Sequence, residues 1–351
     1  MAAQRTRVAI LFGGRSAEHD VSVRSAASIV SALPPDAFEA VPVAISRSGR
    51  WIQPSEAVRL LPPDAAVRCG LGDVKLRPEP GRSSGFDVVF PALHGPYGED
   101  GRLQGLLDLA DVPYVGCGVL GSACGMDKDV MKRLFLSHGI PTLPHITVRW
   151  ADAEAKLPEV EKAIGYPAFV KPANLGSSVG IRRAADRANL EQALAHAGQF
   201  DDKLIVEPAV DAREIECGVL GLDPPRASVP GEIVTHKGFY DYETKYLTDS
   251  AELHVPAAIP PATTRAIREL SVKAFRAIGC DGLARVDFFL DTESGEPLVN
   301  EVNTMPGFTS ISMYPRMWDA SGVPFPELIA RLIECAVVRH RRNQRLRVDR
   351  A

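Results

Sequence analysis

The sequence lacks the patterns that mark zinc proteins, disulfide frameworks and membrane proteins. Its six cysteines include no C-x-x-C pair and its eight histidines no H-x-x-x-H spacing, so no zinc site is predicted. No apolar run approaches the ~18 residues of a membrane span, and Val8–Phe12 is too short for a signal peptide. We therefore expect reduced thiols, a cytoplasmic location and no membrane partner.

Neither sign of charge is in large excess. The net charge is −4 over 351 residues, which gives no general case for a nucleic-acid partner. The tail 339–351 is an exception, with six arginines and one aspartate. It could bind a small anionic partner, but a frayed, solvated helix end is the favoured interpretation. The chain length allows two or three domains, and 45% apolar with 24% charged residues is an ordinary globular composition.

Strands alternate with helices in the first third of the chain, which predicts an α/β domain with an open parallel sheet. The predicted elements there are strands at 8–13, 39–46, 87–94 and 113–116, and helices at 21–33 and 101–111. The remainder mixes strands and helices, with a hairpin at 283–290 and 297–303 and a final helix at 325–338. We expect three domains, at 1–125, 126–225 and 226–351.

The hairpin carries the strongest signal of chemistry. Side chains alternate faces along a strand, so Arg285 and Asp287 share one face of the first strand, and Glu301 and Asn303 share one face of the second. The polar turn 291–296 lets the strands pair, which would bring the two carboxylates and the amide together. Oxygen ligands without His or Cys suit Mg²⁺. A metal site is therefore favoured over a solvent-facing polar face.

A loop rich in Gly and Ser follows a predicted strand at 168–172. It reads K-P-A-N-L-G-S-S-V-G (171–180), in which Ser177 and Ser178 add hydroxyl donors to the backbone N–H groups. Such a loop can cover phosphate oxygens, with Lys171 as a cation, although an ordinary hairpin turn is equally consistent. No G-x-x-x-x-G-K-[ST] motif occurs, and the G-x-G-x-x-G at 116–121 is interpreted as a tight turn.

The loop 13–19 follows the first strand, where open α/β sheets bind ligands. Glu18 in this loop would attract a cation such as the ammonium group of an amino acid. His94, at the end of the strand 87–94, can reach the same crevice. Taken singly, a Glu and a His are more often surface residues, so these two assignments depend on their neighbours.

Together these residues resemble the D-alanine–D-alanine ligase family of the ATP-grasp fold. The matching segments run in family order over residues 5–338: L-F-G-G-R-S-A-E-H-D-V-S (11–22), A-L-H-G-P-Y-G-E-D-G (92–101), G-M-D-K (125–128), V-K-P-A-N-L-G-S-S-V-G (170–180), F-Y-D-Y-E-T-K-Y-L (239–247), G-L-A-R-V-D (282–287) and N-E-V-N-T-M-P-G-F-T-S (300–310). The resemblance implies a Rossmann-like N-terminal domain and two α+β domains that enclose ATP. It also implies that a homodimer joins two D-alanine molecules through a D-alanyl phosphate, for peptidoglycan synthesis.

The resemblance assigns roles to individual residues. ATP would be bound by Lys128, Lys171, Ser177, Ser178, Glu207, Val210 and Glu214. Two Mg²⁺ ions, or Mn²⁺ in their place, would be bound by Asp287, Glu301 and Asn303. The catalytic residues would be Glu18, Ser177, Lys245, Tyr246, Arg285 and Gly307, and the substrate-binding residues Glu18, His94, Arg285, Gly307, Ser312 and Met313. The aromatic-rich segment 236–252 would form a lid that excludes water, with a disordered surface loop as the alternative.

Two other functions stay open. The stretch 282–315 is closer to ligases that make D-alanyl-D-lactate, but those enzymes carry His in the lid where this chain has Tyr246. The second alternative is a non-catalytic nucleotide-binding module. It is disfavoured because a chain that had lost catalysis would not need to keep Lys171, Arg285 and the metal-binding residues. Pro208 stands where family members often carry Lys, which puts a side-chain contact to adenine from that position in doubt.

Overall fold

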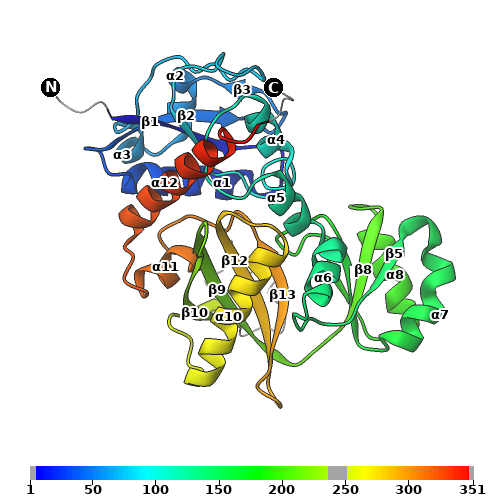
Figure 1. Cartoon of the computed structure of the whole chain (residues 1–351). Helices are drawn as coiled ribbons and strands as arrows, with labels where there is room; N and C mark the ends of the chain where they lie inside the picture. Colours follow the sequence, from blue (N-terminus) through cyan, green and yellow to red (C-terminus); the bar gives the residue numbers. More distant parts are fainter. Residues whose placement is uncertain (1–4, 236–250, 348–351) are drawn as a thin grey trace.

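The computed structural model describes residues 5–235 and 251–347, which form three sheet-based units (Figure 1). The N-terminal unit is drawn in blue and cyan and the central unit mainly in green, while the third unit runs from green (β9, β10) through yellow and orange to red (α12). No helix in these ranges is both long and apolar enough to cross a membrane. All six cysteines lie in the described ranges and are free thiols, as expected.

The N-terminal unit is an open sheet of order β3-β2-β1-β4. The central strand β1 (Thr6–Gly13) pairs in parallel with β2 (Phe38–Ile45) and β4 (Val88–Pro91), and the edge strand β3 (Trp51–Ile52) is antiparallel. Apolar side chains cover both faces of β1, which explains its continuous hydrophobic run. The helices are α1 (His19–Ala32), α2 (Pro54–Ala57), η1 (Val58–Leu60), α3 (Pro63–Ala66), α4 (Arg102–Leu109) and α5 (Val119–Met126). The predicted parallel sheet is confirmed, although 113–116 contributes only one bridge, between Val89 and Tyr114.

The central unit is an antiparallel sheet of order β5-β8-β6-β7. Its elements are α6 (Lys128–Ser137), β5 (Ile146–Arg149), η2 (Trp150–Asp152), α7 (Ala153–Ala163), β6 (Ala168–Pro172), β7 (Arg182–Ala184), α8 (Arg187–Ala197) and β8 (Lys203–Pro208). Val170 and Val206 share a core with residues of α7 and α8 on one face of the sheet. Because side chains alternate along a strand, Lys171 and Glu207 extend from the opposite face.

The third unit is an antiparallel sheet of order β11-β10-β9-β12-β13. Its elements are β9 (Ala212–Gly221), β10 (Arg226–Thr235), β11 (Ala251–His254), α10 (Pro261–Ala277), β12 (Gly282–Asp291), β13 (Pro297–Asn303), α11 (Met313–Asp319) and α12 (Phe325–Asn343). Helix α10 covers one face, where Phe275 packs in one core with Val286 and Val302. The polar residues of β12 and β13 therefore lie on the other face, toward the central unit.

The structure differs from expectation in two connections. Strand β9 pairs with β10 and β12, so a domain boundary at 225 would separate it from its own sheet. The prediction of a frayed helix end from residue 339 is wrong for Arg339, which is 5% exposed. Its guanidinium donates to the carbonyl oxygens of Tyr114 and Gly116 and stacks on the Tyr114 ring. Helix α12 therefore returns to the N-terminal unit and fastens it to the third unit.

Candidate active site

The polar face of the third sheet gathers the hairpin residues as expected. The pairing of β12 with β13 places Arg285 opposite Asn303 and Asp287 opposite Glu301. On the other side of β12, Asp287 lies opposite Glu216 of β9. This register supports the predicted convergence of Asp287, Glu301 and Asn303, and Arg285 and Glu216 join them. Glu216 was not predicted as a site residue, although it alternates with a second glutamate along β9.

Arg285 is held by carboxylates on two sides. Its Nε and Nη2 donate to the two oxygens of Asp287, each at 2.7 Å, and its Nε lies 3.0 Å from Oε2 of Glu216. Burial alone would lower the pKa of Arg285, but Asp287 and Glu216 more than offset it and hold that pKa well above its ordinary value. The guanidinium is therefore charged and fixed in orientation.

The oxygen atoms of this face fit a hard divalent cation. The buried Oδ1 of Asn303 finds no hydrogen-bond partner in the described part of the chain. No three His, Cys, Asp or Glu side chains within residues 5–235 and 251–347 are grouped to hold a metal by themselves. Two carboxylates and one amide would leave coordination positions for water and phosphate oxygens, which is the binding mode that Mg²⁺ prefers.

Lysines of the central unit face this sheet. The Nζ of Lys128, at the start of α6, lies 3.1 Å from Oε2 of Glu301 and donates to the carbonyl oxygen of Leu175 at 2.8 Å. The Nζ of Lys171, on β6, lies 5.8 Å from the ring centre of Phe289 on β12. Positive charge thus lines the space opposite the carboxylates, where a polyphosphate would be stabilised.

Glu207 lies fully buried between two lysines. Its Oε1 is 2.5 Å from Nζ of Lys132, and its Oε2 is 2.5 Å from Nζ of Lys171. Burial raises the pKa of Glu207, but the charges of Lys171 and Lys132 outweigh burial and bring it to about 2. Burial lowers the pKa of Lys171, but the charge of Glu207 outweighs burial and holds this pKa above its ordinary value. Both oxygens of Glu207 therefore face lysines, and the expected contact to adenine stays a prediction.

The loop after β6 reaches the N-terminal unit. Ser177 and Ser178 have φ of 52° and 56°, a left-handed backbone that costs non-glycine residues of the order of 1–2 kcal/mol. The Oγ of Ser177 donates a short hydrogen bond to Oε1 of Glu18. At the start of the loop, the backbone N and Nδ2 of Asn174 both donate to Asp201, at 2.7 and 2.9 Å. Two of the predicted catalytic residues are thus in contact.

His94 is buried with both ring nitrogens engaged. Its Nδ1 lies 3.0 Å from the carbonyl oxygen of Met305, and its Nε2 lies 3.0 Å from Oγ of Ser25. A carbonyl can only accept, so Nδ1 carries the proton and Nε2 accepts from Ser25. Burial is the main cause that lowers the pKa of His94, which favours this neutral ring. His94 therefore ties the N-terminal unit to the segment that carries Gly307.

Glu99 is a buried carboxylate that the sequence did not single out. Its Oε1 accepts from the backbone N of Gly95 at 2.8 Å, and its buried Oε2 has no hydrogen-bond partner among the described residues. Burial, followed by the charge of Glu18, raises the pKa of Glu99 well above its ordinary value. Glu99 borders a cavity of about 30 Å³ together with Lys128 and Glu301.

The segment after β13 carries the remaining predicted substrate residues. A Cβ placed on Gly307 would lie 3.0 Å from Oγ of Ser312, so the two residues are in close approach. The Oγ of Ser312 accepts from the backbone N of Thr309 at 3.1 Å. Met313 begins α11 and is buried. Gly307, Ser312 and Met313 are therefore brought together at one end of the third sheet.

Val210 lies outside this cluster, and two further predicted residues lie outside the described ranges. Val210 is exposed just beyond β8, whereas Glu214 is half-buried on the polar face, where its charge helps to raise the pKa of Lys171. Lys245 and Tyr246 lie outside the described residues, as does most of the predicted lid 236–252.

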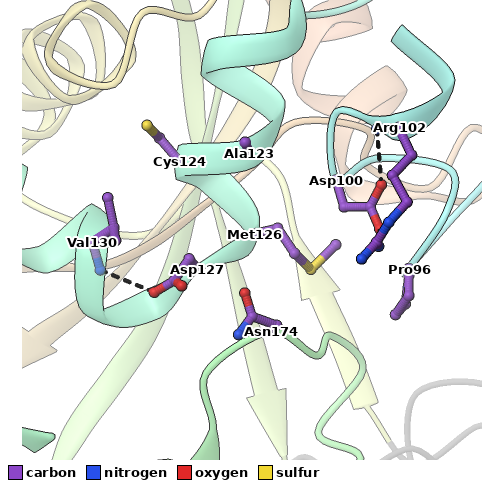
Figure 2. Close-up of a pocket in the computed structure, with 9 residues that line it drawn as sticks. All are labelled: Pro96, Asp100, Arg102, Ala123, Cys124, Met126, Asp127, Val130 and Asn174. Carbon is purple, nitrogen blue, oxygen red and sulfur yellow. Dashed lines mark hydrogen bonds and ion pairs between the residues drawn. The ribbon is translucent and has the colours of Figure 1, made fainter. Parts of the chain in front are cut away.

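A larger hollow of about 440 Å³ lies beside the site (Figure 2). Figure 2 shows Asp127 in its wall, where the carboxylate accepts from the backbone N of Val130 at 3.0 Å and caps α6. Its other lining residues are Pro96, Asp100, Arg102, Ala123, Cys124, Met126 and Asn174. None of the predicted site residues lines this hollow, so its size does not make it the centre of the chemistry.

Two family models match most of the chain. One, described as "D-ala D-ala ligase N-terminus", covers residues 7–117, and the other, described as "D-ala D-ala ligase C-terminus", covers residues 134–334. The D-alanine–D-alanine ligase of Heliobacterium modesticaldum is 48% identical, over 98% of this chain and 98% of that protein. The D-alanine–D-alanine ligase of Deinococcus radiodurans is also 48% identical, over 95% of this chain and 99% of that protein.

Solved structures share the whole fold. The VanG D-Ala:D-Ser ligase from Enterococcus faecalis superposes with a TM-score of 0.85 at 36% identity, over 95% of this chain and 100% of that one. The D-alanine–D-alanine ligase from Coxiella burnetii superposes with a TM-score of 0.83 at 36% identity, over 98% and 97% of the two chains. These structures are similar to this chain from end to end.

Proposed function

Because the chain belongs to the D-alanine–D-alanine ligase family, we propose that its polar sheet face and the facing lysines join two D-alanine molecules with ATP. In the first step a carboxylate oxygen of one D-alanine attacks the γ-phosphorus and ADP leaves. In the second step the amine of another D-alanine attacks the carbonyl carbon and phosphate leaves. The product, D-alanyl-D-alanine, is a peptidoglycan precursor. The observation that carries this proposal is the fixed Arg285 opposite Lys128 and Lys171.

The central unit would bind ATP. Lys128 and Lys171 would meet the phosphate oxygens, because the Nζ of Lys128 lies beside Glu301 of the third unit and the Nζ of Lys171 lies near Phe289 of that unit. Ser177 and Ser178 would cover the γ-phosphate with their hydroxyl and N–H groups. The proposed contacts to adenine and ribose involve Glu207, Val210 and Glu214.

Asp287, Glu301 and Asn303 would hold Mg²⁺. When bound, two such ions would neutralise the charge that develops on the transferred phosphoryl group. The chain's own contribution would be a set of half-buried oxygen ligands on adjacent strands, in register with one another. The amide of Asn303 is available for this role, because its Oδ1 is otherwise unsatisfied within the described residues.

Glu18 and Arg285 would orient the first D-alanine. The carboxylate of Glu18 would pair with the substrate ammonium group, while its bond to Ser177 holds the phosphate loop against the substrate. Arg285 and the backbone N–H of Gly307 would donate to the oxyanion of the tetrahedral intermediate. His94 would help to place Gly307, since it binds the carbonyl oxygen of Met305 two residues earlier.

Ser312 and the backbone N–H of Met313 would bind the carboxylate of the second D-alanine. Lys245 would approach the transferred phosphate, and Tyr246 would extend the chain from Glu18 and Ser177. The lid would keep water from the acyl-phosphate, which would otherwise hydrolyse. We also propose that the protein is a homodimer and that it is located in the cytoplasm.

Phosphate release and product mass test this function. With ATP and Mg²⁺, the protein should release phosphate only when D-alanine is present, and the product should have the mass of the dipeptide. D-lactate and D-serine serve as competing second substrates, because a D-Ala:D-Ser ligase shares the fold. If the product contains mainly one of these competitors, that compound and not D-alanine is the second substrate. Absence of turnover with every acceptor would favour the nucleotide-binding module.

A further inference from the structure

Lys132 is a buried lysine for which the proposed reaction has no role. It lies one helical turn after Lys128 on α6, and its side chain is 1% exposed. Its Nζ lies 2.5 Å from Oε1 of Glu207 and donates to Oγ1 of Thr142 at 2.9 Å. Thr142 in turn donates to the carbonyl oxygen of Val299 on β13 at 2.7 Å. Lys132 is therefore tethered at the junction of the central and third units.

Glu207 divides its two oxygens between Lys132 and Lys171. If Lys171 is to meet a phosphate of ATP, it must weaken its contact with Glu207. A buried carboxylate left without a cation is strongly unfavourable, so Glu207 alone would hold Lys171 back. Lys132 removes this obstacle, because it keeps one cation against Glu207 whether or not Lys171 has moved.

We propose that Lys132 is a positioning residue that lets Lys171 leave Glu207 for the phosphates of ATP. The inference rests on the proposed function, in which Lys171 binds those phosphates. Lys132 itself touches neither ATP nor D-alanine and acts through the carboxylate of Glu207. The rigid tether through Thr142 to Val299 favours this role, because it keeps Lys132 in place while Lys171 moves.

The proposal predicts that a change at Lys132 affects the binding of ATP but not the binding of a nucleoside without phosphates. Replacing Lys132 by Met keeps the apolar stem and removes the charge, so Lys171 would be the remaining ion-pair partner of Glu207 among the described residues. Binding of ATP should then weaken by roughly tenfold or more, since a charge-assisted contact to phosphate is lost or strained. Binding of adenosine, which has no phosphate, should not change. Lys132→Arg restores a cation and should recover most of the affinity for ATP.

Lys203→Met is the matched control. Lys203 is another largely buried lysine of the same unit. Its Nζ pairs with Asp127 at 2.5 Å and Asp129 at 3.3 Å rather than with Glu207. Loss of a buried ion pair should make this variant less stable than wild type. Its affinity for ATP should nevertheless equal that of wild type. Thermal unfolding identifies a temperature at which all variants are folded, and calorimetric titration with ATP and adenosine is done there.

Three outcomes would overturn the inference. Unchanged ATP affinity in Lys132→Met would leave this lysine a purely structural role. An equal loss for ATP and adenosine would mean that it acts on the base through Glu207. An equal loss of ATP affinity in Lys203→Met would show a general effect of breaking a buried pair. Dipeptide synthesis by wild type, measured in parallel, tests the proposed function independently of these titrations.

Discussion

The substitution Asp287→Asn tests the polar sheet face most sharply. Asp287 gives both oxygens to Arg285 at 2.7 Å and is a proposed ligand of Mg²⁺. Asn keeps the volume and one acceptor, but it removes the charge and replaces one oxygen by an N–H donor. The variant therefore misaligns the oxyanion donor and weakens the metal site in one step, while the backbone ladder of β12 is retained.

The expected size follows from these contacts. A hydrogen bond between charged groups contributes about 1.5–3 kcal/mol, and at least one of the two bonds from Arg285 is lost. Loss of a metal ligand adds a further cost of several kcal/mol in the transition state. Even about 3 kcal/mol in total corresponds to a fall of roughly 150-fold in kcat, because each 1.36 kcal/mol is a factor of ten.

Asp291→Asn provides the control for this measurement. It is the same chemical change on the same strand, at the end that binds the turn residues Glu293 and Ser294. Steady-state phosphate release with D-alanine and ATP should fall at least roughly a hundredfold for Asp287→Asn and stay near wild type for Asp291→Asn. If Asp287→Asn stays within tenfold of wild type while folded, the assignment of this face is refuted.

Further predictions concern the substrate, the lid, pH and the C-terminal helix. Glu18→Gln should raise the KM for D-alanine far more than that for ATP; the reverse pattern would show that Glu18 does not hold the ammonium group. Wild type given equal D-alanine and D-lactate at pH 6 should make only dipeptide by mass spectrometry, because Tyr246 is neutral, whereas Tyr246→His should incorporate some D-lactate below about pH 7. Burial raises the pKa of Asp129, but hydrogen bonds led by Thr147 outweigh burial and bring this pKa to about 2. In an unfolded chain the pKa of an Asp is ~3.9. The stabilisation from Asp129 is therefore present above that pH and is lost as the pH falls toward about 2. Urea midpoints should therefore fall on acidification, and less steeply in Asp129→Asn. Arg339→Met should lower the urea midpoint while the exposed Arg341→Met does not; equal midpoints would show that the buried contacts do not stabilise α12.

The hairpin could be predicted because strand alternation is a local rule. Once 283–290 and 297–303 were assigned as strands, the shared faces followed, and the register of Asp287 with Glu301 confirmed them. Glu216 alternates with Glu214, so the two share a strand face, but the local sequence does not indicate that this strand pairs with the hairpin. Which strands neighbour each other depends on packing of segments distant in sequence.

Lys132 and Glu99 could not be predicted in this way. Lys132 belongs to no motif, and Glu99 lies in the matching segment 92–101 without a role assigned to it. Each acquires its importance from burial beside groups that are distant in sequence, Glu207 for Lys132 and Glu18 for Glu99. Arg339 was misjudged because its neighbours are basic, although it lies three residues after the buried Ala336 on the apolar face of α12. The helical spacing of the buried residues Ile333 and Ala336 continues to Arg339.

Oxygen transfer from the substrate tests the central claim most directly. If the γ-phosphoryl group is passed to the carboxylate of the first D-alanine, phosphate leaves with one oxygen of that carboxylate when the amine attacks. D-alanine labelled with ¹⁸O in its carboxylate should therefore yield phosphate that carries one ¹⁸O for each dipeptide formed, as read by mass spectrometry. Dipeptide formed together with unlabelled phosphate, in unlabelled water, would contradict the acyl-phosphate route.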